Sequence, residues 1–180
     1  WMAKSLYLPI FLSFLILLLF SSLAKAQEKL DVFDVARKGN AQQAVEIIKT
    51  DVKAFNTKNE NGFSPLILAC YRGNNEVAKV LIENNCDLNA KSEMGTALMA
   101  SIVKGNNEIA KLLIQKKVDI NLTDDQGTTA LMYAVQFKNI NLVKLLLTNN
   151  ADKSLIDSKG KTAFEYAVFS GNESIITLLK

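Results

Sequence analysis

Residues 59–91 read NENGFSPLILACYRGNNEVAKVLIENNCDLNAK and carry the signals that decide the fold. Ser64 is a good helix N-cap, and Pro65 suits the first turn of a helix that Gly73 can end with a positive φ. A second amphipathic helix is predicted from Asn75 onward, and the polar residues after it suit an extended turn. The stretch therefore predicts two short helices joined by a tight turn and followed by a projecting finger.

These signals recur along the chain at a nearly constant interval. A basic-Gly-Asn triplet, weakened in its later copies, stands at residues 38–40, 72–74, 104–106, 137–139 and 170–172. The steps between the central residues are 34, 32, 33 and 33. One unit of this kind cannot bury both of its apolar faces, so neighbouring units must stack. The sequence therefore predicts an all-α repeat solenoid.

The repeated unit resembles the ankyrin repeat family in its Ser/Thr-Pro-Leu helix start, its turn glycine and its Asp-x-Asn ending. The best copy is the stretch quoted above, and the resemblance covers about residues 30–180. It implies helix-turn-helix units with β-turn fingers: about four repeats, the last truncated, after a degenerate N-terminal helix pair at about residues 30–49. It also places Leu113 and Leu146 in the core that neighbouring repeats share.

Two repeats depart from the family pattern. Repeat 2 lacks one residue between Gly95 and Thr96, so we expect its finger to be irregular. Lys138 stands where repeat 3 should have its turn glycine, and a left-handed lysine costs about 1 kcal/mol relative to glycine. Neither departure changes the predicted fold.

The N-terminal residues have the three-part layout of a secretory signal peptide. A short positive start at residues 2–4 precedes an uncharged apolar run at residues 6–20, and Ala24-Lys25-Ala26 offers a small-x-small cleavage pattern. We therefore expect cleavage after Ala26, which removes residues 1–26 and leaves a repeat domain over residues 27–180 in the periplasm or outside the cell. A retained membrane anchor is the alternative, because the apolar run is nearly long enough to span a bilayer.

The composition of the 180-residue chain argues against several classes of chemistry. Histidine, the commonest general base and metal ligand, does not occur, and a formal net charge of +3 is too weak to predict nucleic-acid binding. Residues 119–125 look like part of a calcium loop, but they lack the required glycine and glutamate, and we interpret them as a finger turn. We expect no catalytic site, no cofactor and no bound metal.

Two cysteines, Cys70 and Cys86, fall within the same repeat. Both stand where the family pattern has small alanines, and a free cysteine packs as a small hydrophobic residue, which favours buried free thiols. A disulfide between them is the alternative, because an exported protein meets an oxidising compartment.

The resemblance also implies an interaction surface, because binding residues in this family come from finger tips and from the two positions before the turn glycine. Carried over, the turn pairs are Tyr71/Arg72, Val103/Lys104, Gln136/Phe137 and Phe169/Ser170. The finger positions are Glu60, Asn61, Phe63, Glu93, Met94, Asp125, Gln126, Thr128, Ser158 and Lys159. We expect a partner to contact Phe63, Tyr71, Arg72, Met94, Val103, Lys104, Gln136, Phe137 and Phe169. Packing of these side chains against neighbouring repeats is the alternative.

The sequence thus indicates a monomeric, non-enzymatic, exported and bacterial interaction module or scaffold that binds and supports a partner protein. A secreted inhibitor or toxin-immunity protein is the nearest alternative, and a strongly charged concave face would favour it. A small-ligand-binding protein or an enzyme is the alternative from a different class, and it would need a pocket with convergent polar groups. We expect no nucleic acid as a partner, and contact with a membrane only through an uncleaved signal peptide.

Overall fold

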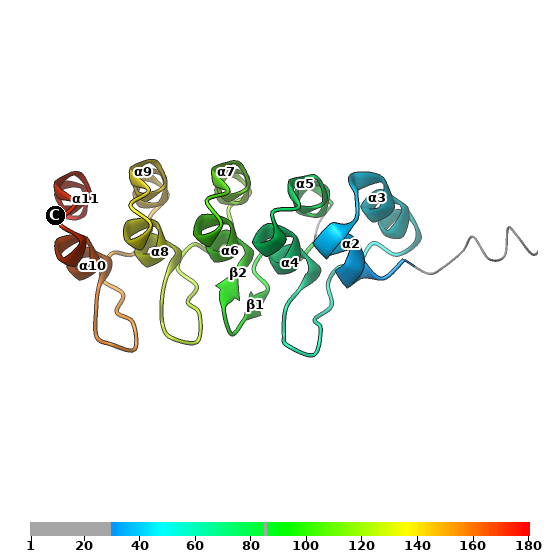
Figure 1. Cartoon of the computed structure of the whole chain (residues 1–180), viewed down its shortest axis with the longest axis horizontal. Helices are drawn as coiled ribbons and strands as arrows, with labels where there is room; N and C mark the ends of the chain where they lie inside the picture. The colour runs from blue at the N-terminus through cyan, green and yellow to red at the C-terminus, as the bar shows by residue number, and fades with distance from the viewer. Residues whose placement is uncertain (1–29, 85) are drawn as a thin grey trace, which may run out of the picture. The chain divides into compact units, whose positions relative to one another are not determined.

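Residues 30–84 and 86–180 are described by a computed structural model of the chain. The expected signal peptide over residues 1–26 lies outside these residues, so its cleavage stays a prediction. Asp31–Lys180 forms a stack of helix pairs whose fingers all project from the same edge (Figure 1). Among the helices that the structure describes, none is both long enough and apolar enough to cross a membrane.

Each pair consists of a first helix and a second helix that returns antiparallel to it (Figure 1). The first helices are α2 (Val32–Lys38), α4 (Pro65–Arg72), α6 (Ala97–Val103), α8 (Ala130–Gln136) and α10 (Ala163–Ser170). The second helices are α3 (Ala41–Thr50), α5 (Asn75–Glu83), α7 (Asn107–Gln115), α9 (Ile140–Thr148) and α11 (Glu173–Leu179). Of the first helices, α4, α6, α8 and α10 each begin beside a finger (Figure 1). The N-terminal helix pair, the three full repeats and the short last repeat stand where the sequence predicts them.

Hydroxyl and amide side chains fix where the helices begin. The Ser64 hydroxyl accepts a hydrogen bond from the backbone N–H of Ile67, and threonines cap α6, α8 and α10 in the same way. Gly73 ends α4 with a φ of 73°. Lys138 adopts the predicted left-handed conformation with a φ of 54°. The turn that the repeat geometry requires is therefore kept even where the sequence lacks glycine.

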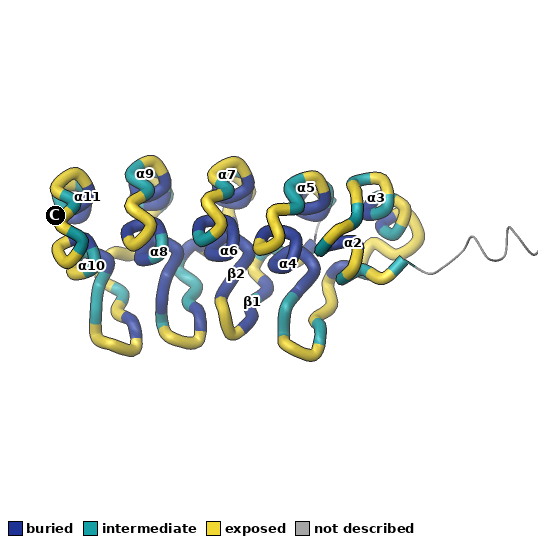
Figure 2. Tube along the Cα trace, viewed as in Figure 1, coloured by how far each residue is buried: buried dark blue, intermediate teal, exposed yellow. Residues whose placement is uncertain are grey.

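The core lies between the two helix layers and between neighbouring repeats, as the buried stretches in Figure 2 show. Leu113 and Leu146 are completely buried, which confirms their predicted place in the shared core, and Leu81 is buried at the matching position of α5. Adjacent first helices pack on one another along the stack, and so do adjacent second helices. Each repeat thus buries its apolar faces against the units next to it.

Asparagines join the repeats at both ends of the helices. The Asn89 side-chain oxygen accepts from the backbone N–H of Asp119 at 2.9 Å, and Asn121 accepts from Asp152 at 2.8 Å in the next repeat. At the opposite end, the Asn139 amide donates to the Asn107 side chain at 2.7 Å. The periodic Asp-x-Asn signal therefore marks a junction between neighbouring repeats, and the Asn121 side chain of the calcium-like stretch is used in that junction.

The finger of repeat 2 differs from the others, as its missing residue predicts. It forms a two-stranded antiparallel hairpin, with β1 (Lys91–Ser92) pairing with β2 (Gly95–Thr96). Gly95 has a φ of 94° there, a conformation that L-residues with side chains rarely adopt. The fingers of repeats 1, 3 and 4 are instead closed by an Asn or Asp whose carboxyl or amide oxygen accepts backbone N–H bonds two and four residues later.

Cys70 and Cys86 are both buried free thiols, which confirms the favoured prediction over a disulfide. Burial raises the pKa of Cys70 to about 12 and that of Cys86 to about 11. Both side chains therefore stay protonated at neutral pH and fill space in repeat 1 as small apolar groups.

Candidate interaction surface

The two positions before each turn form two parallel rows across the first helices, since they repeat once per stacked unit. The first row holds Tyr71, Val103, Gln136 and Phe169, and the second holds Arg72, Lys104, Phe137 and Ser170. Phe137 therefore aligns with the cations and not with the other two aromatic residues. All of these side chains are exposed except Val103 and Ser170, which are half-buried. The structure thus places most of the predicted turn positions on the surface.

Tyr71 and Lys104 come together across the boundary between repeats 1 and 2. The Lys104 ammonium lies over the Tyr71 ring, 4.5 Å from its centroid, which is within the range of a cation–π contact. This contact holds the charge of Lys104 at a fixed place beside Tyr71. It also shows that the turn positions of neighbouring repeats are close enough to act as one surface.

Phe169 is the most exposed large apolar residue in the described part of the chain, with 86% of its surface accessible. Lys161 lies over its ring at 5.5 Å from the centroid and over the Tyr166 ring at 5.6 Å. Val168 beside it is 51% exposed. The last repeat therefore presents an apolar group that has a cation on one side of it.

The finger positions divide into exposed and covered side chains. Met94 is 53% exposed at the tip of the repeat 2 hairpin, whereas Phe63 is only half-exposed in the finger of repeat 1. Thr128, another of the finger positions, is 8% exposed, so its side chain is covered within the finger of repeat 3. Its backbone N–H is bound by the Asp124 carboxylate at 2.8 Å, which turns this part of the finger inward.

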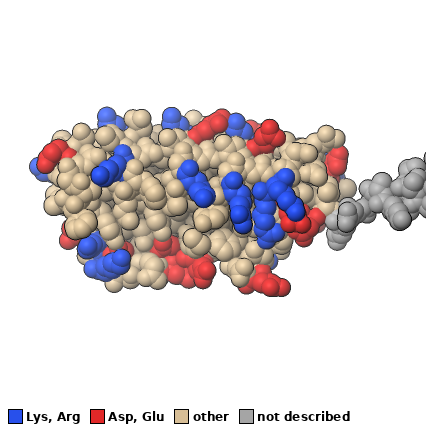
Figure 3. All heavy atoms as spheres, in the orientation of Figure 1, with Lys and Arg blue, Asp and Glu red and all other residues tan. Residues whose placement is uncertain are grey.

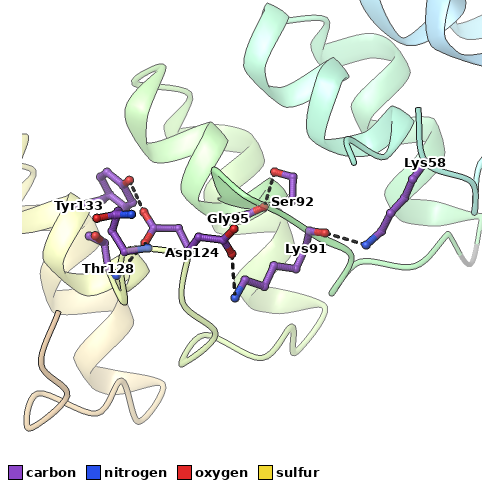
Figure 4. A network of polar contacts seen from close by, with 9 residues as sticks. Lys58, Lys91, Ser92, Gly95, Asp124, Thr128 and Tyr133 are labelled. Atoms are coloured by element: carbon purple, nitrogen blue, oxygen red, sulfur yellow. Dashed lines mark hydrogen bonds and ion pairs between the residues drawn. The ribbon is translucent and has the colours of Figure 1, made fainter. Parts of the chain in front are cut away.

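Two tyrosines tie fingers to first helices, and the sequence interpretation missed them. The Tyr133 hydroxyl of α8 donates to the Asp124 carboxylate at 2.6 Å, as Figure 4 shows, and Tyr166 of α10 donates to Asp157 in the same manner. Burial and the hydrogen bond to Asp124 raise the pKa of Tyr133 to about 12. The signal was present as a tyrosine nine residues after the finger aspartate in both repeats.

Polar contacts also link one finger to the next (Figure 4). The Lys58 ammonium donates to the carbonyl of Lys91 at 2.8 Å, and the Lys91 ammonium pairs with Asp125 at 3.6 Å. The backbone N–H of Asp125 donates to the carbonyl of Glu93 at 3.1 Å. The fingers of repeats 1 to 3 are therefore held in a row, so that their tips present a continuous edge.

Acidic side chains are unevenly distributed on this side of the molecule. Figure 3 shows basic atoms across the middle of the view, whereas most acidic atoms lie along the finger edge and the second-helix edge, where basic atoms also occur. The exposed finger acids are Glu60, Glu93 and Asp125, while α4, α6 and α8 contain no acidic residue. The middle of this side is thus basic, and its two edges carry charges of both signs (Figure 3).

A shallow pocket of about 220 Å³ lies away from these positions, between the ends of α7 and α9. Its lining residues are Ile114, Lys117, Val118, Ile120, Thr148, Asn149 and Asn150. Lys117 is the one ionisable group among them, and proton-transfer catalysis by this lining would require a partner acid or base that it does not contain. Within residues 30–84 and 86–180, no three His, Cys, Asp or Glu side chains are grouped as metal ligands.

Comparison with known proteins agrees with the repeat architecture. A family model described as "Ankyrin repeats (3 copies)" matches residues 32–124 and 104–180. Over 59 residues the chain is 37% identical to "Ankyrin repeat and SAM domain-containing protein 6" of Danio rerio. That alignment covers 33% of this chain and 8% of the relative, so the chain spans a small part of that protein's length.

Proposed function

The chain belongs to the ankyrin repeat family, whose repeats are protein–protein interaction modules, and from this premise we propose that it is an exported, non-enzymatic protein that binds and supports one partner protein. The partner-binding surface comprises the exposed turn positions of the first helices and the finger tips beside them. The export half of the proposal rests on the signal-peptide layout of residues 1–26.

The observation that carries the binding half is where large apolar side chains are exposed. Seven such side chains are exposed in the described residues, and four of them are predicted contact residues. These four are Tyr71, Met94, Phe137 and Phe169. Side chains of this kind gain the most from being buried against a partner, and aromatic residues are enriched among the residues that dominate binding energy.

The arrangement also supports a binding function in preference to catalysis. The contact residues lie on regular helices and on fingers that are linked by hydrogen bonds, so the surface is preorganised and loses little freedom when a partner binds. The cations beside the turn residues, Arg72 and Lys104, supply charge that a partner protein can pair with.

A variant of three aromatic residues tests the binding surface. Tyr71→Ala, Phe137→Ala and Phe169→Ala are combined, and circular dichroism first establishes that the variant folds. We expect it to lose the protein that wild type captures from the native exported fraction, because each aromatic anchor contributes about 2 kcal/mol or more.

The matched control changes three residues on the second helices, the exposed Glu76 and Lys111 and the half-buried Lys79, as Glu76→Ala, Lys79→Ala and Lys111→Ala. This control should still capture the same protein as wild type. Loss of capture by the control together with retention by the aromatic variant would place the binding surface on the second helices and refute the assignment.

A further inference from the structure

Four cations line the turns between first and second helices, one in each of four successive units. They are Lys38, Arg72 and Lys104, each just before a turn glycine, and Lys138 at the glycine position of repeat 3, and we call them the cationic row. All four are exposed, and none of them forms an ion pair with an acidic side chain among the residues described by the structure. The charge of this row is therefore available to a ligand.

We propose that the cationic row recognises an extended acidic segment of the partner protein, with acidic side chains spaced at about every third residue. This inference rests on the proposed function and specifies the chemistry of the partner. Adjacent first helices pack directly on one another, and packed helices lie about 8–10 Å apart. An extended chain advances about 3.3 Å per residue, so three residues match one repeat.

The neighbourhood of the row limits where an acidic ligand can lie. The finger tips carry Glu60 and Glu93, which repel a carboxylate that moves toward that edge, while Asp125 beside them is paired with Lys91. The first helices α4, α6 and α8 contribute no acidic residue that would compete for the cations. A narrow acidic strand along the turns fits this pattern better than a broad polyanion, whose phosphates would also approach the acidic finger tips.

One cation of the row is already held in place. Lys104 lies over the Tyr71 ring, so its ammonium is oriented before a ligand arrives. A preorganised side chain loses less conformational freedom on binding than a freely moving lysine does. Lys104 is therefore the cation expected to contribute most, and Arg72 is the cation that follows Tyr71 in the neighbouring repeat.

A second row of lysines supplies a matched control. Lys79, Lys111 and Lys144 repeat with the same period on α5, α7 and α9. Acidic residues lie among them, and Lys79 is paired with Glu108 at 2.6 Å. The two rows have a similar spacing, but none of the turn cations forms an ion pair in the described structure, although Glu76 and Glu108 follow the turns at the starts of α5 and α7.

The test measures binding of labelled synthetic peptides by fluorescence anisotropy at about 10 mM salt, where the Debye length is about 30 Å. One peptide has four glutamates at every third position in a Gly/Ser background. A second has the same composition with the glutamates adjacent, and a third has glutamines at the spaced positions. We expect the spaced acidic peptide to bind most tightly and to lose affinity as salt is raised.

Two double variants with equal loss of charge assign the site. Arg72→Gln with Lys104→Gln should weaken binding of the spaced peptide by about 4- to 25-fold, since each exposed ion pair contributes about 2- to 5-fold. Lys111→Gln with Lys144→Gln should leave binding within about 2-fold of wild type. Because cations near a helix C-terminus also stabilise the helix, thermal unfolding of both variants must first be shown to match that of wild type.

Four outcomes would overturn the inference. Two concern the peptides, namely equal binding of the spaced and adjacent peptides and no binding of either. The third is an equal loss of affinity for the spaced peptide in both double variants. The fourth is tighter binding of an oligothymidylate of about 12 nucleotides than of the spaced peptide, which would indicate a nucleic-acid surface. If the peptides fail while partner capture still depends on Tyr71, Phe137 and Phe169, the acidic segment is wrong and the proposed function stands.

Discussion

Removing the Tyr133 hydroxyl by Tyr133→Phe should destabilise the protein through the finger of repeat 3. The hydroxyl donates to the Asp124 carboxylate at 2.6 Å, and Asp124 is 5% exposed. The other carboxylate oxygen accepts the backbone N–H groups of Gln126 and Thr128. A hydrogen bond to a charged group contributes about 1.5–3 kcal/mol, so we expect a loss of that size in the free energy of unfolding.

Urea unfolding followed by circular dichroism measures this loss, and thermal unfolding should show a fall in Tm of about 3–12 °C for a domain of this size. Tyr71→Phe is the matched control, because it removes an exposed phenol hydroxyl that has no hydrogen-bond partner in the described structure. It should change the free energy of unfolding by less than about 0.5 kcal/mol.

The effect of Tyr133→Phe should also depend on pH in a defined direction. The pKa of Tyr133 is raised to about 12 by burial and by the hydrogen bond to Asp124, whereas a tyrosine in the unfolded chain has a pKa of about 10. The stabilising contribution is therefore complete below about pH 10 and declines as the pH rises toward 12. A loss below about 0.5 kcal/mol at neutral pH, or a difference from wild type that is unchanged at high pH, would refute the role given to this tyrosine.

Four further predictions follow from the repeat register, the turn, the thiols and the signal peptide. Leu113→Ala or Leu146→Ala should lower the free energy of unfolding by about 2–5 kcal/mol in urea titrations, because both side chains are completely buried, and losses below about 1 kcal/mol at both sites would contradict the register. Lys138→Gly should raise the free energy of unfolding by up to about 1 kcal/mol, since Lys138 has a φ of 54°, and a destabilised variant would show that the lysine side chain matters more than its backbone. Cys70 and Cys86 should react with a thiol reagent only on unfolding, because burial raises the pKa of both, and reaction of fewer than two thiols in denaturant would indicate a disulfide. The intact mass of the native protein should correspond to a mature N-terminus at Gln27, whereas a species that keeps residues 2–26 would be an anchored protein.

Most of the fold could be predicted because each periodic signal has a local physical cause. Ser64 and the threonines at its equivalent positions stand at helix starts because their hydroxyls cap free N–H groups, and Gly73 stands at a turn because of its positive φ. These causes act over a few residues, so they can be recognised without knowledge of the packing. The hairpin in the finger of repeat 2 was predicted only as an irregularity, since the missing residue shows that the loop is shorter and not how it closes.

The interaction surface was less predictable, because the exposure of a side chain depends on which other residues pack against it. Phe63 and Thr128 occupy finger positions that the family pattern assigns to contacts, yet one is half-buried and the other is buried. The bonds from Tyr133 to Asp124 and from Tyr166 to Asp157 join a helix to a finger. Repeats 1 and 2 have Leu68 and Ala100 at the tyrosine position, so the pairing does not run through the whole array.

The asparagine junctions give this protein a simple route to a different length. Asn107 pairs with Asn139 one period away, and Asn89 and Asn121 each bind the backbone of the following repeat. A tandem duplication of one period would therefore supply both the hydrogen-bond donor and the acceptor of every new junction. No donor or acceptor at a junction would be left without a partner. Since contacts in such arrays are between nearest neighbours, the added copy would also extend the surface by one unit. The reach of the protein along a partner can thus evolve by copying a segment, without any change to the residues already present.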